Sequence, residues 1–192
     1  MLNPAPSTTP PPSYGQWLVH LKLFVLTFVV FFVVLYFFEL IPEIGLDIDF
    51  KPFFIPITLL VLFPRSSHAW AIGLAVAGSE LLGDFFEPGG VEPDDPIGFF
   101  GYLVGALAAG AVMQGRWQSP LWIVLGGLTY ALVNGMMEAA VWLALGEFGT
   151  DALQSLLGNM VTHGIIAGGI VAIPLARLLK PYLTRWVGIP TT

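Results

Sequence analysis

The sequence predicts an all-α integral membrane protein: a compact bundle of six transmembrane helices with both termini on the cytoplasmic side. Three observations support this prediction. Hydrophobic residues make up 56% of the 192 residues, charged residues only 10%, and the mean hydropathy is +0.80. Soluble domains carry roughly 25% charged residues, so this chain has more apolar surface than a soluble domain of its size can hide. The apolar residues also form six runs, and basic and acidic residues separate to opposite ends of those runs.

Composition excludes several functional classes. The chain has no cysteine, which excludes a disulfide framework, a thiolate metal site and a cysteine nucleophile. The net charge of −6 leaves no basic footprint for a nucleic acid partner. No metalloprotease, phosphate-loop or nucleotide-binding motif occurs, so we expect no catalytic residue and no cofactor. Three histidines without a metal-ligand spacing predict no dedicated metal site.

The two ends of the chain differ from its middle. Residues 1–16 are rich in Pro, Ser and Thr and carry no charge, which predicts a disordered cytoplasmic tail rather than a signal peptide. Residues 17–182 form the expected transmembrane domain, and residues 183–192 form a short cytoplasmic tail.

The first three expected helices differ in length and composition. A helix needs about 20 apolar residues to cross a bilayer, and residues 17–41 meet that length. Residues 50–63 are short and contain two prolines, so a re-entrant segment and five full spans are the alternative. Residues 69–86 form the third span, which the sequence "PRSSH" separates from the second.

The last three expected helices are residues 97–113, 121–145 and 152–179. The final one is long and rich in glycine, with Pro174 near its end. Glycine and alanine recur four residues apart in the third, fourth and sixth expected helices, as in "small-xxx-small" contacts that let helices approach closely. The pairs and runs are Gly73/Ala77, Gly101/Gly105/Ala109, Ala106/Gly110 and Gly164/Gly168. The first span lacks such residues and is expected to face lipid or a large apolar partner surface.

Charge asymmetry fixes the expected orientation in the plasma membrane. With six spans and a cytoplasmic N-terminus, six of the seven basic residues lie on the inner side, as the positive-inside rule requires. These are Lys22, Arg65, Arg116, Arg177, Lys180 and Arg185, and Lys51 is the exception. Of the 13 acidic residues, ten fall at or beyond outer ends, and Glu80, Asp84 and Glu138 lie within spans.

Polar residues inside the spans predict a binding pocket open to the outside. An ionisable group in a membrane costs roughly 2.5–3.5 kcal/mol on insertion scales, so each is a functional candidate. Three helices each carry a polar pair at spacing i, i+4, which places both members on one face in the outer half. The predicted pocket residues are Glu80, Asp84, Asn134, Glu138, Asn159 and His163, with aromatic walls from Tyr102 and Trp142, and from Phe99 and Tyr130.

Charge in this set predicts the ligand. Carboxylates outnumber bases, so we expect a cationic or neutral, hydrogen-bonding and partly aromatic molecule. The structural alternative is that Glu138 pairs with His163 between helices and that Asp84 is an interfacial acid.

The middle of the chain, roughly residues 40–182, resembles the substrate-binding S components of energy-coupling factor (ECF) vitamin transporters. The resemblance rests on the order of "IDFKPFFIPITLLVLFP", "AWAIGLAVAGSELLGDFFEPGG", "DPIGFFGYLVGALAAGAVMQGR" and "LLGNMVTHGIIAGGIVAIPLARLLKPYL". It implies capture of a vitamin-like molecule, with a transmembrane T component and two ATPase subunits as partners. Many S components carry an AxxxA contact in the first helix, whereas the first span here has no alanine.

Two other functions fit the sequence. The chain also looks like the rod-shape protein MreD, a membrane scaffold of cell-wall synthesis that binds no substrate. The third hypothesis is an auxiliary subunit of a larger membrane complex. A binder requires the polar residues to converge on one cavity, whereas a scaffold does not.

Overall fold

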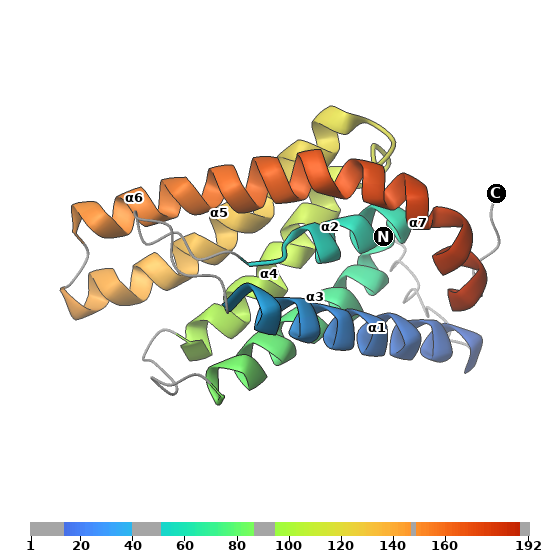
Figure 1. The fold of residues 1–192 in the computed structure, drawn as a ribbon, viewed down its shortest axis with the longest axis horizontal. Helices are drawn as coiled ribbons and strands as arrows, with labels where there is room; N and C mark the ends of the chain where they lie inside the picture. The colour runs from blue at the N-terminus through green and yellow to red at the C-terminus, as the bar shows by residue number, and fades with distance from the viewer. Residues whose placement is uncertain (1–13, 40–50, 87–94, 147–148, 189–192) are drawn as a thin grey trace, which may run out of the picture.

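The computed structural model describes residues 14–39, 51–86, 95–146 and 149–188, and these residues form helices joined by short turns. The ribbon in Figure 1 shows successive elements running in alternating directions along the bundle. The last three elements form one continuous rod in which a π-helical segment, η1, separates two α-helices. The elements are α1 (Tyr14–Glu39), α2 (Phe54–Leu62), α3 (Ser66–Asp84), α4 (Asp95–Met113), α5 (Pro120–Leu145), α6 (Thr150–Asn159), η1 (Met160–Val171) and α7 (Ala172–Val187).

Four helical stretches of the described chain are long and apolar enough to cross a membrane: Gly15–Phe38, Pro96–Met113, Pro120–Leu145 and Leu156–Val187. The all-α fold class and the membrane character are thus confirmed in this coarser form. The second predicted span appears as the nine-residue helix α2, about 14 Å long and too short to cross alone. Residues 40–50 lie outside the described residues. Helix α3 has 19 residues but is less apolar, because it carries His68, Glu80 and Asp84.

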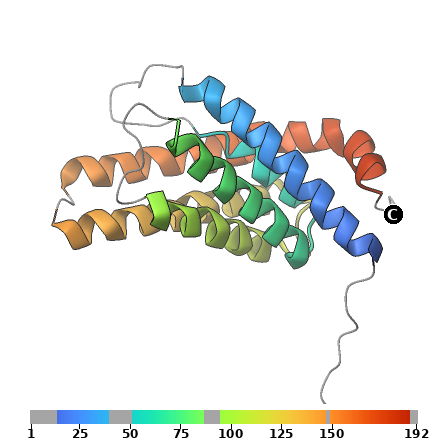
Figure 2. The ribbon, with the colours of Figure 1, turned by 90° about the horizontal axis from the view of Figure 1, so that it is seen from below.

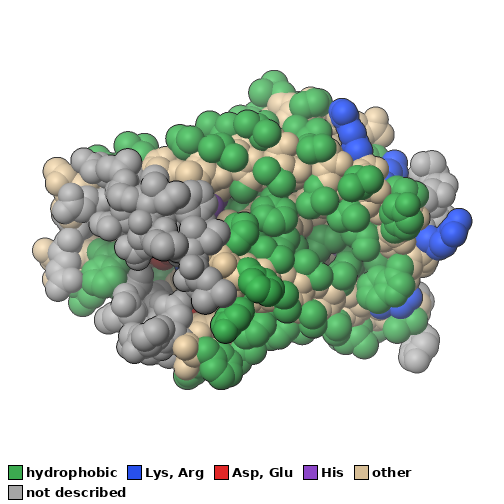
Figure 3. Space-filling view, in the orientation of Figure 1, with side chains coloured by type: hydrophobic (Ala, Val, Ile, Leu, Met, Phe, Trp, Pro, Cys, Tyr) green, Lys and Arg blue, Asp and Glu red, His purple; other side chains and the backbone are tan. Residues whose placement is uncertain are grey.

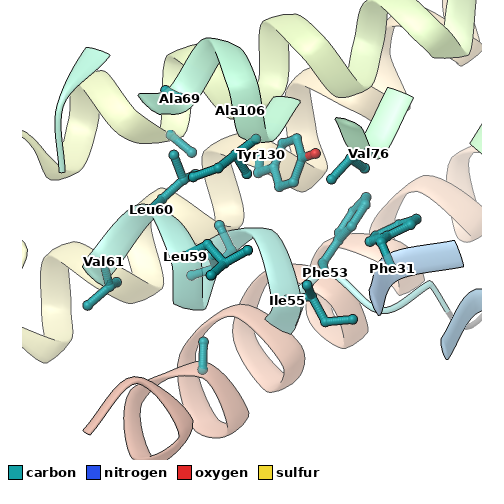
Figure 4. Close-up of a cluster of buried hydrophobic side chains, with 14 of the residues drawn as sticks. Phe31, Phe53, Ile55, Leu59, Leu60, Val61, Ala69, Val76, Ala106 and Tyr130 are labelled. Carbon is teal, nitrogen blue, oxygen red and sulfur yellow. The ribbon is translucent and has the colours of Figure 1, made fainter. Parts of the chain in front are cut away.

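Helix α2 lies at the centre of the bundle. Its sequence, "FIPITLLVL", is apolar all round, and such a helix is normally buried. It packs against α1, α3, α4, α5, η1 and α7. Figure 4 shows the core around it, with Ile55, Leu59, Leu60 and Val61 of α2 beside Phe31, Phe53, Val76, Ala106 and Tyr130 from the surrounding elements. Since lipid is as apolar as these side chains, close packing rather than exclusion of water holds this core together.

Helix α1 lies at the periphery and packs mainly on α3. It leaves Val25, Val29, Val33 and Phe37 exposed. This placement agrees with the absence of small residues, since a helix without them cannot bring its backbone close to a neighbour.

Glycines set the distances between α4, α5 and η1. A Cβ at Gly101 of α4 would lie 2.9 Å from Asn134 Oδ1 and 3.3 Å from the Asn134 Cα on α5. A Cβ at Gly164 of η1 would lie 3.0 Å from the Leu128 Cα, and one at Gly168 would lie 2.8 Å from the Gly127 Cα. The close helix approach predicted from the small-residue spacing is confirmed at these contacts.

Basic side chains gather at one end of the bundle. Figure 3 shows Lys and Arg at the end where α7 finishes, on the right of the view. The start of α1 lies at the same end, as Figure 2 shows. Lys22 of α1 donates a hydrogen bond to the Trp186 carbonyl of α7, 2.9 Å away, and so ties these two elements together. Lys51 lies apart from the other basic residues, in contact with Glu80. We call the end with the six other basic residues the basic end and the other the acidic end.

Replacing Gly101 by alanine tests the α4–α5 contact. The new methyl group meets backbone atoms of α5, which cannot move aside as a side chain would. We expect Gly101→Ala to lower the free energy of unfolding in detergent by about 1–3 kcal/mol. The matched control is Gly98→Ala on the same helix, where the nearest atom to a Cβ is 3.8 Å away. Equal stability of the two variants in thermal unfolding would contradict the close approach.

Candidate functional site

Six polar residues from α3, α4, α5, η1 and the segment before α2 lie together toward the acidic end. We call them the polar cluster: Lys51, Glu80, Tyr102, Asn134, Glu138 and His163. Five of the six were predicted as pocket residues from sequence. The sixth, Lys51, was expected in an outer loop. The structure therefore brings a base into a site whose predicted composition had none besides His163.

Glu80 is the best connected member. Its carboxylate Oε1 accepts a hydrogen bond from Lys51 Nζ at 2.5 Å and one from the Tyr102 hydroxyl at 2.7 Å. Glu80 is 6% exposed and Tyr102 is 1% exposed, so both lie in the interior. A buried carboxylate needs a counter-charge and hydrogen bonds to offset its lost solvation. Lys51 and Tyr102 provide both, which explains how α3 tolerates an acid at this depth.

Lys51 also reaches the last helical rod. Its backbone N–H donates a hydrogen bond to His163 Nε2 at 2.9 Å. A histidine nitrogen that accepts a hydrogen bond carries no proton, so this bond fixes His163 as neutral with its proton on Nδ1. Lys51 therefore bridges α3 and η1 with two different groups. His163 lies in the π-helical segment, and π-helical turns occur frequently at functional sites.

Phe53 packs at the centre of the aromatic part of the site. Its ring centroid lies 4.8 Å from Tyr130, 4.8 Å from His163 and 5.9 Å from Tyr102. Since these three rings belong to α5, η1 and α4, Phe53 contacts three helical elements at once. Sequence reasoning did not select Phe53 or Lys51.

Asn134 and Glu138 form the second half of the cluster. Asn134 Nδ2 donates a hydrogen bond to Glu138 Oε1 at 2.6 Å along one face of α5. Gly98 and Gly101 of α4 face this pair. The carboxylates of Glu80 and Glu138 both lie within electrostatic reach of the Tyr102 hydroxyl. Tyr102 thus connects the Glu80 and Glu138 sides of the site.

Several buried polar atoms at the site have no hydrogen-bond partner in the described structure. They are Glu80 Oε2, Asn134 Oδ1, Asn159 Oδ1 and the Tyr130 hydroxyl. Native structures contain few such atoms, and each calls for an explanation such as a bound ligand or water. Three of the four are acceptor oxygens, one each from α3, α5 and α6. A hydrogen-bond donor from water or from a bound molecule would satisfy these atoms.

The remaining predicted residues extend the site along its helices. Asp84 is 8% exposed and lies one turn beyond Glu80 on α3. Trp142 lies one turn beyond Glu138 on α5, and Asn159 lies one turn before His163. No group of three or more His, Asp or Glu side chains within the described residues forms a potential metal site.

Lys51 gave one sequence signal that would have identified it. It is the only basic residue at the end of the spans where the acids gather. A lone cation among acids at a membrane boundary is a candidate ion-pair partner for the nearest buried carboxylate.

Comparison with protein-family models, with curated proteins and with solved structures found no match to this chain. The site is therefore interpreted from its own geometry.

Replacing Lys51 tests the ion pair. Lys51→Met leaves the buried Glu80 carboxylate without its counter-charge, and breaking such a pair costs about 3–5 kcal/mol. We expect a correspondingly lower unfolding temperature in detergent. The double variant Lys51→Met with Glu80→Gln should recover most of that stability, because no uncompensated charge is left. Lys22→Met, which removes an exposed hydrogen bond, is the control. A double variant no more stable than Lys51→Met alone would contradict the assigned pairing.

Proposed function

We propose that this chain is a membrane-embedded substrate-capture subunit that binds a small molecule rich in hydrogen-bond donors. The observation that carries the proposal is the set of unpaired buried acceptors, Glu80 Oε2, Asn134 Oδ1 and Asn159 Oδ1. They come from three helices that flank the same polar cluster. A purely structural core normally satisfies such atoms internally, since each unpaired buried group costs about 1–3 kcal/mol.

Charge and shape favour a cationic or neutral ligand. The site contains three carboxylates, Glu80, Asp84 and Glu138, and the basic side chain of Lys51, which forms an ion pair with Glu80. The aromatic rings of Phe53, Tyr102 and Tyr130 offer faces that attract a cation or stack on a planar group. A vitamin-like molecule with amine or amide groups and an aromatic ring matches both features.

The proposed pocket opens to the outside of the plasma membrane. This orientation follows from six passes with both termini in the cytoplasm, which puts the basic end inside under the positive-inside rule. Helix α2, with nine residues, is too short to be a complete span by itself. The alternation of elements in Figure 1 is consistent with this path.

The resemblance to ECF S components gives the proposal its transport context. In that class the capture subunit hydrolyses no ATP, and a T component with two ATPase subunits drives uptake. We propose partners of this kind together with membrane lipid, and assign no catalytic role or cofactor to this chain. The alanine-free first helix implies that contact with a T component would differ from the usual AxxxA contact.

A membrane scaffold like MreD, or an auxiliary subunit of a larger complex, is the second candidate. The Lys51–Glu80 ion pair favours it, because a paired and buried carboxylate is also how a purely structural core would appear. The two candidates differ in what the unpaired acceptors do.

Leucine substitutions at Asn134 and Asn159 separate the candidates. In a binder, each variant should lose the bound small molecule that native mass spectrometry detects on gently purified wild-type protein. The apo Asn159→Leu variant should also be at least as stable as wild type, because an unsatisfied polar atom has been removed. Asn134→Leu also removes the hydrogen bond that Asn134 donates to Glu138, so this variant is compared by binding alone. Thr129→Val on α5 is the control, since Thr129 donates only to the Leu125 carbonyl at 2.8 Å. The proposal would be refuted if wild-type protein repeatedly carried no bound molecule and if, among added compounds, it bound only polyanions tightly.

The absence of cysteine makes the orientation directly testable. In intact cells, a membrane-impermeant thiol reagent should label Phe86→Cys and should not label Ser67→Cys or Gln118→Cys. All three positions are exposed in the structure. After the cells are broken, all three should react. Labelling of Gln118→Cys in intact cells would overturn the proposed topology while leaving the site geometry unchanged.

A further inference from the structure

A cavity lies at the basic end, away from the polar cluster. It has a volume of about 300 Å³ and lies between the end of α2, the turn before α5, the start of α5, and α7. Its walls include Leu62, Ile123 and Ile173, and Arg177 and Lys180 also line it. A volume of this order is at the lower end of small-molecule sites.

The charge on this cavity has one sign. Arg177 and Lys180 are three residues apart on α7, so they share a face, and both are exposed. None of the residues that line the cavity is acidic. Within the described part of the chain, no carboxylate forms an ion pair with either cation. Among the described residues, the two positive charges therefore line the cavity without a counter-charge.

The cavity combines apolar side chains with polar and basic ones, and a phospholipid likewise combines acyl chains with a charged headgroup. Trp117 and Gln118 join the cations, and Lys180 Nζ lies 5.4 Å from the centre of the Trp117 ring. Tryptophan and basic residues are the side chains that mark the membrane–water interface. The first N–H groups of α5, near Pro120, add positive potential because a helix start has no intrahelical acceptors for them. A free inorganic anion would make no favourable contact with the apolar walls, whereas the acyl chains of a lipid would.

We propose that this cavity, which we call the basic cavity, binds the phosphate of an anionic phospholipid headgroup. Arg177 and Lys180 contact the phosphate, and the residues of α2 and α5 contact the glycerol and the first acyl carbons. Basic pockets between transmembrane helices on the cytoplasmic side bind lipid headgroups in this way. A soluble phosphate ester shares the charge but lacks the apolar part. The inference is independent of the ligand proposed for the polar cluster.

The test uses the full chain, purified in mild detergent and freed of lipid. Native mass spectrometry measures binding of phosphatidylglycerol, with phosphatidylcholine and inorganic phosphate as the other probes. Wild type should bind phosphatidylglycerol at least tenfold more tightly than phosphatidylcholine. Arg177→Gln or Lys180→Gln should weaken phosphatidylglycerol binding about fivefold each, and the double variant about thirtyfold. Arg185→Gln, on the same helix but outside the cavity, should bind within about twofold of wild type.

Three outcomes would overturn the proposal. The first is equal affinity of the wild type for the two phospholipids, which needs no substitution and so does not depend on folding of any variant. The second is an equal loss in Arg185→Gln and in the double variant, which would indicate attraction to net charge alone. The third is displacement of phosphatidylglycerol by millimolar inorganic phosphate, which would assign the site to a soluble phosphate.

Discussion

The close approach of α4, α5 and η1 is the constraint on which the site depends. Gly101 lets α4 come near the α5 backbone, and Gly127, Gly164 and Gly168 let α5 come near η1. A side chain at any of these positions would collide with the backbone of the neighbouring helix and push the two helices apart. Tyr102, Asn134 and His163 lie on these same helices, so the glycine contacts set the distances between functional groups as well as the packing.

Close packing of these helices also removes polar side chains from water, so their hydrogen bonds must be made inside the protein. A polar group inside a membrane protein can be satisfied only by the protein, by trapped water or by a ligand. Glu80 is satisfied on one oxygen by Lys51 and Tyr102, while its other oxygen has no partner in the described structure. The site thus combines a fixed ion pair with open acceptors. The ion pair links α3 to the residue before α2, and the unpaired acceptors are the observation on which the proposed binding function rests.

The fold class and much of the site could be predicted because their signals are local. Hydropathy identifies helices, and spacing of four residues places Asn134 with Glu138 and marks the glycine contacts. Lys51 could not be placed in the same way, since it meets Glu80 and His163 across 29 and 112 positions of the chain. Its contacts depend on how the segment before α2 folds inward. The π-helical form of η1 also has no local signal that we identify, beyond its many glycines.

The two ends of the bundle use the same kinds of side chain for opposite purposes. At the acidic end, Lys51 forms an ion pair with the buried carboxylate of Glu80. At the basic end, no described cation forms an ion pair, and three lie over indole rings, as Arg116 does 4.0 Å from the centre of Trp122. A cation–π contact leaves most of the positive charge available to a second partner, whereas an ion pair does not. Because the described residues of the basic end pair with no acid, we infer that their charge remains available to anionic lipid. The charge asymmetry that predicts the orientation of the chain thus also underlies the proposed lipid site.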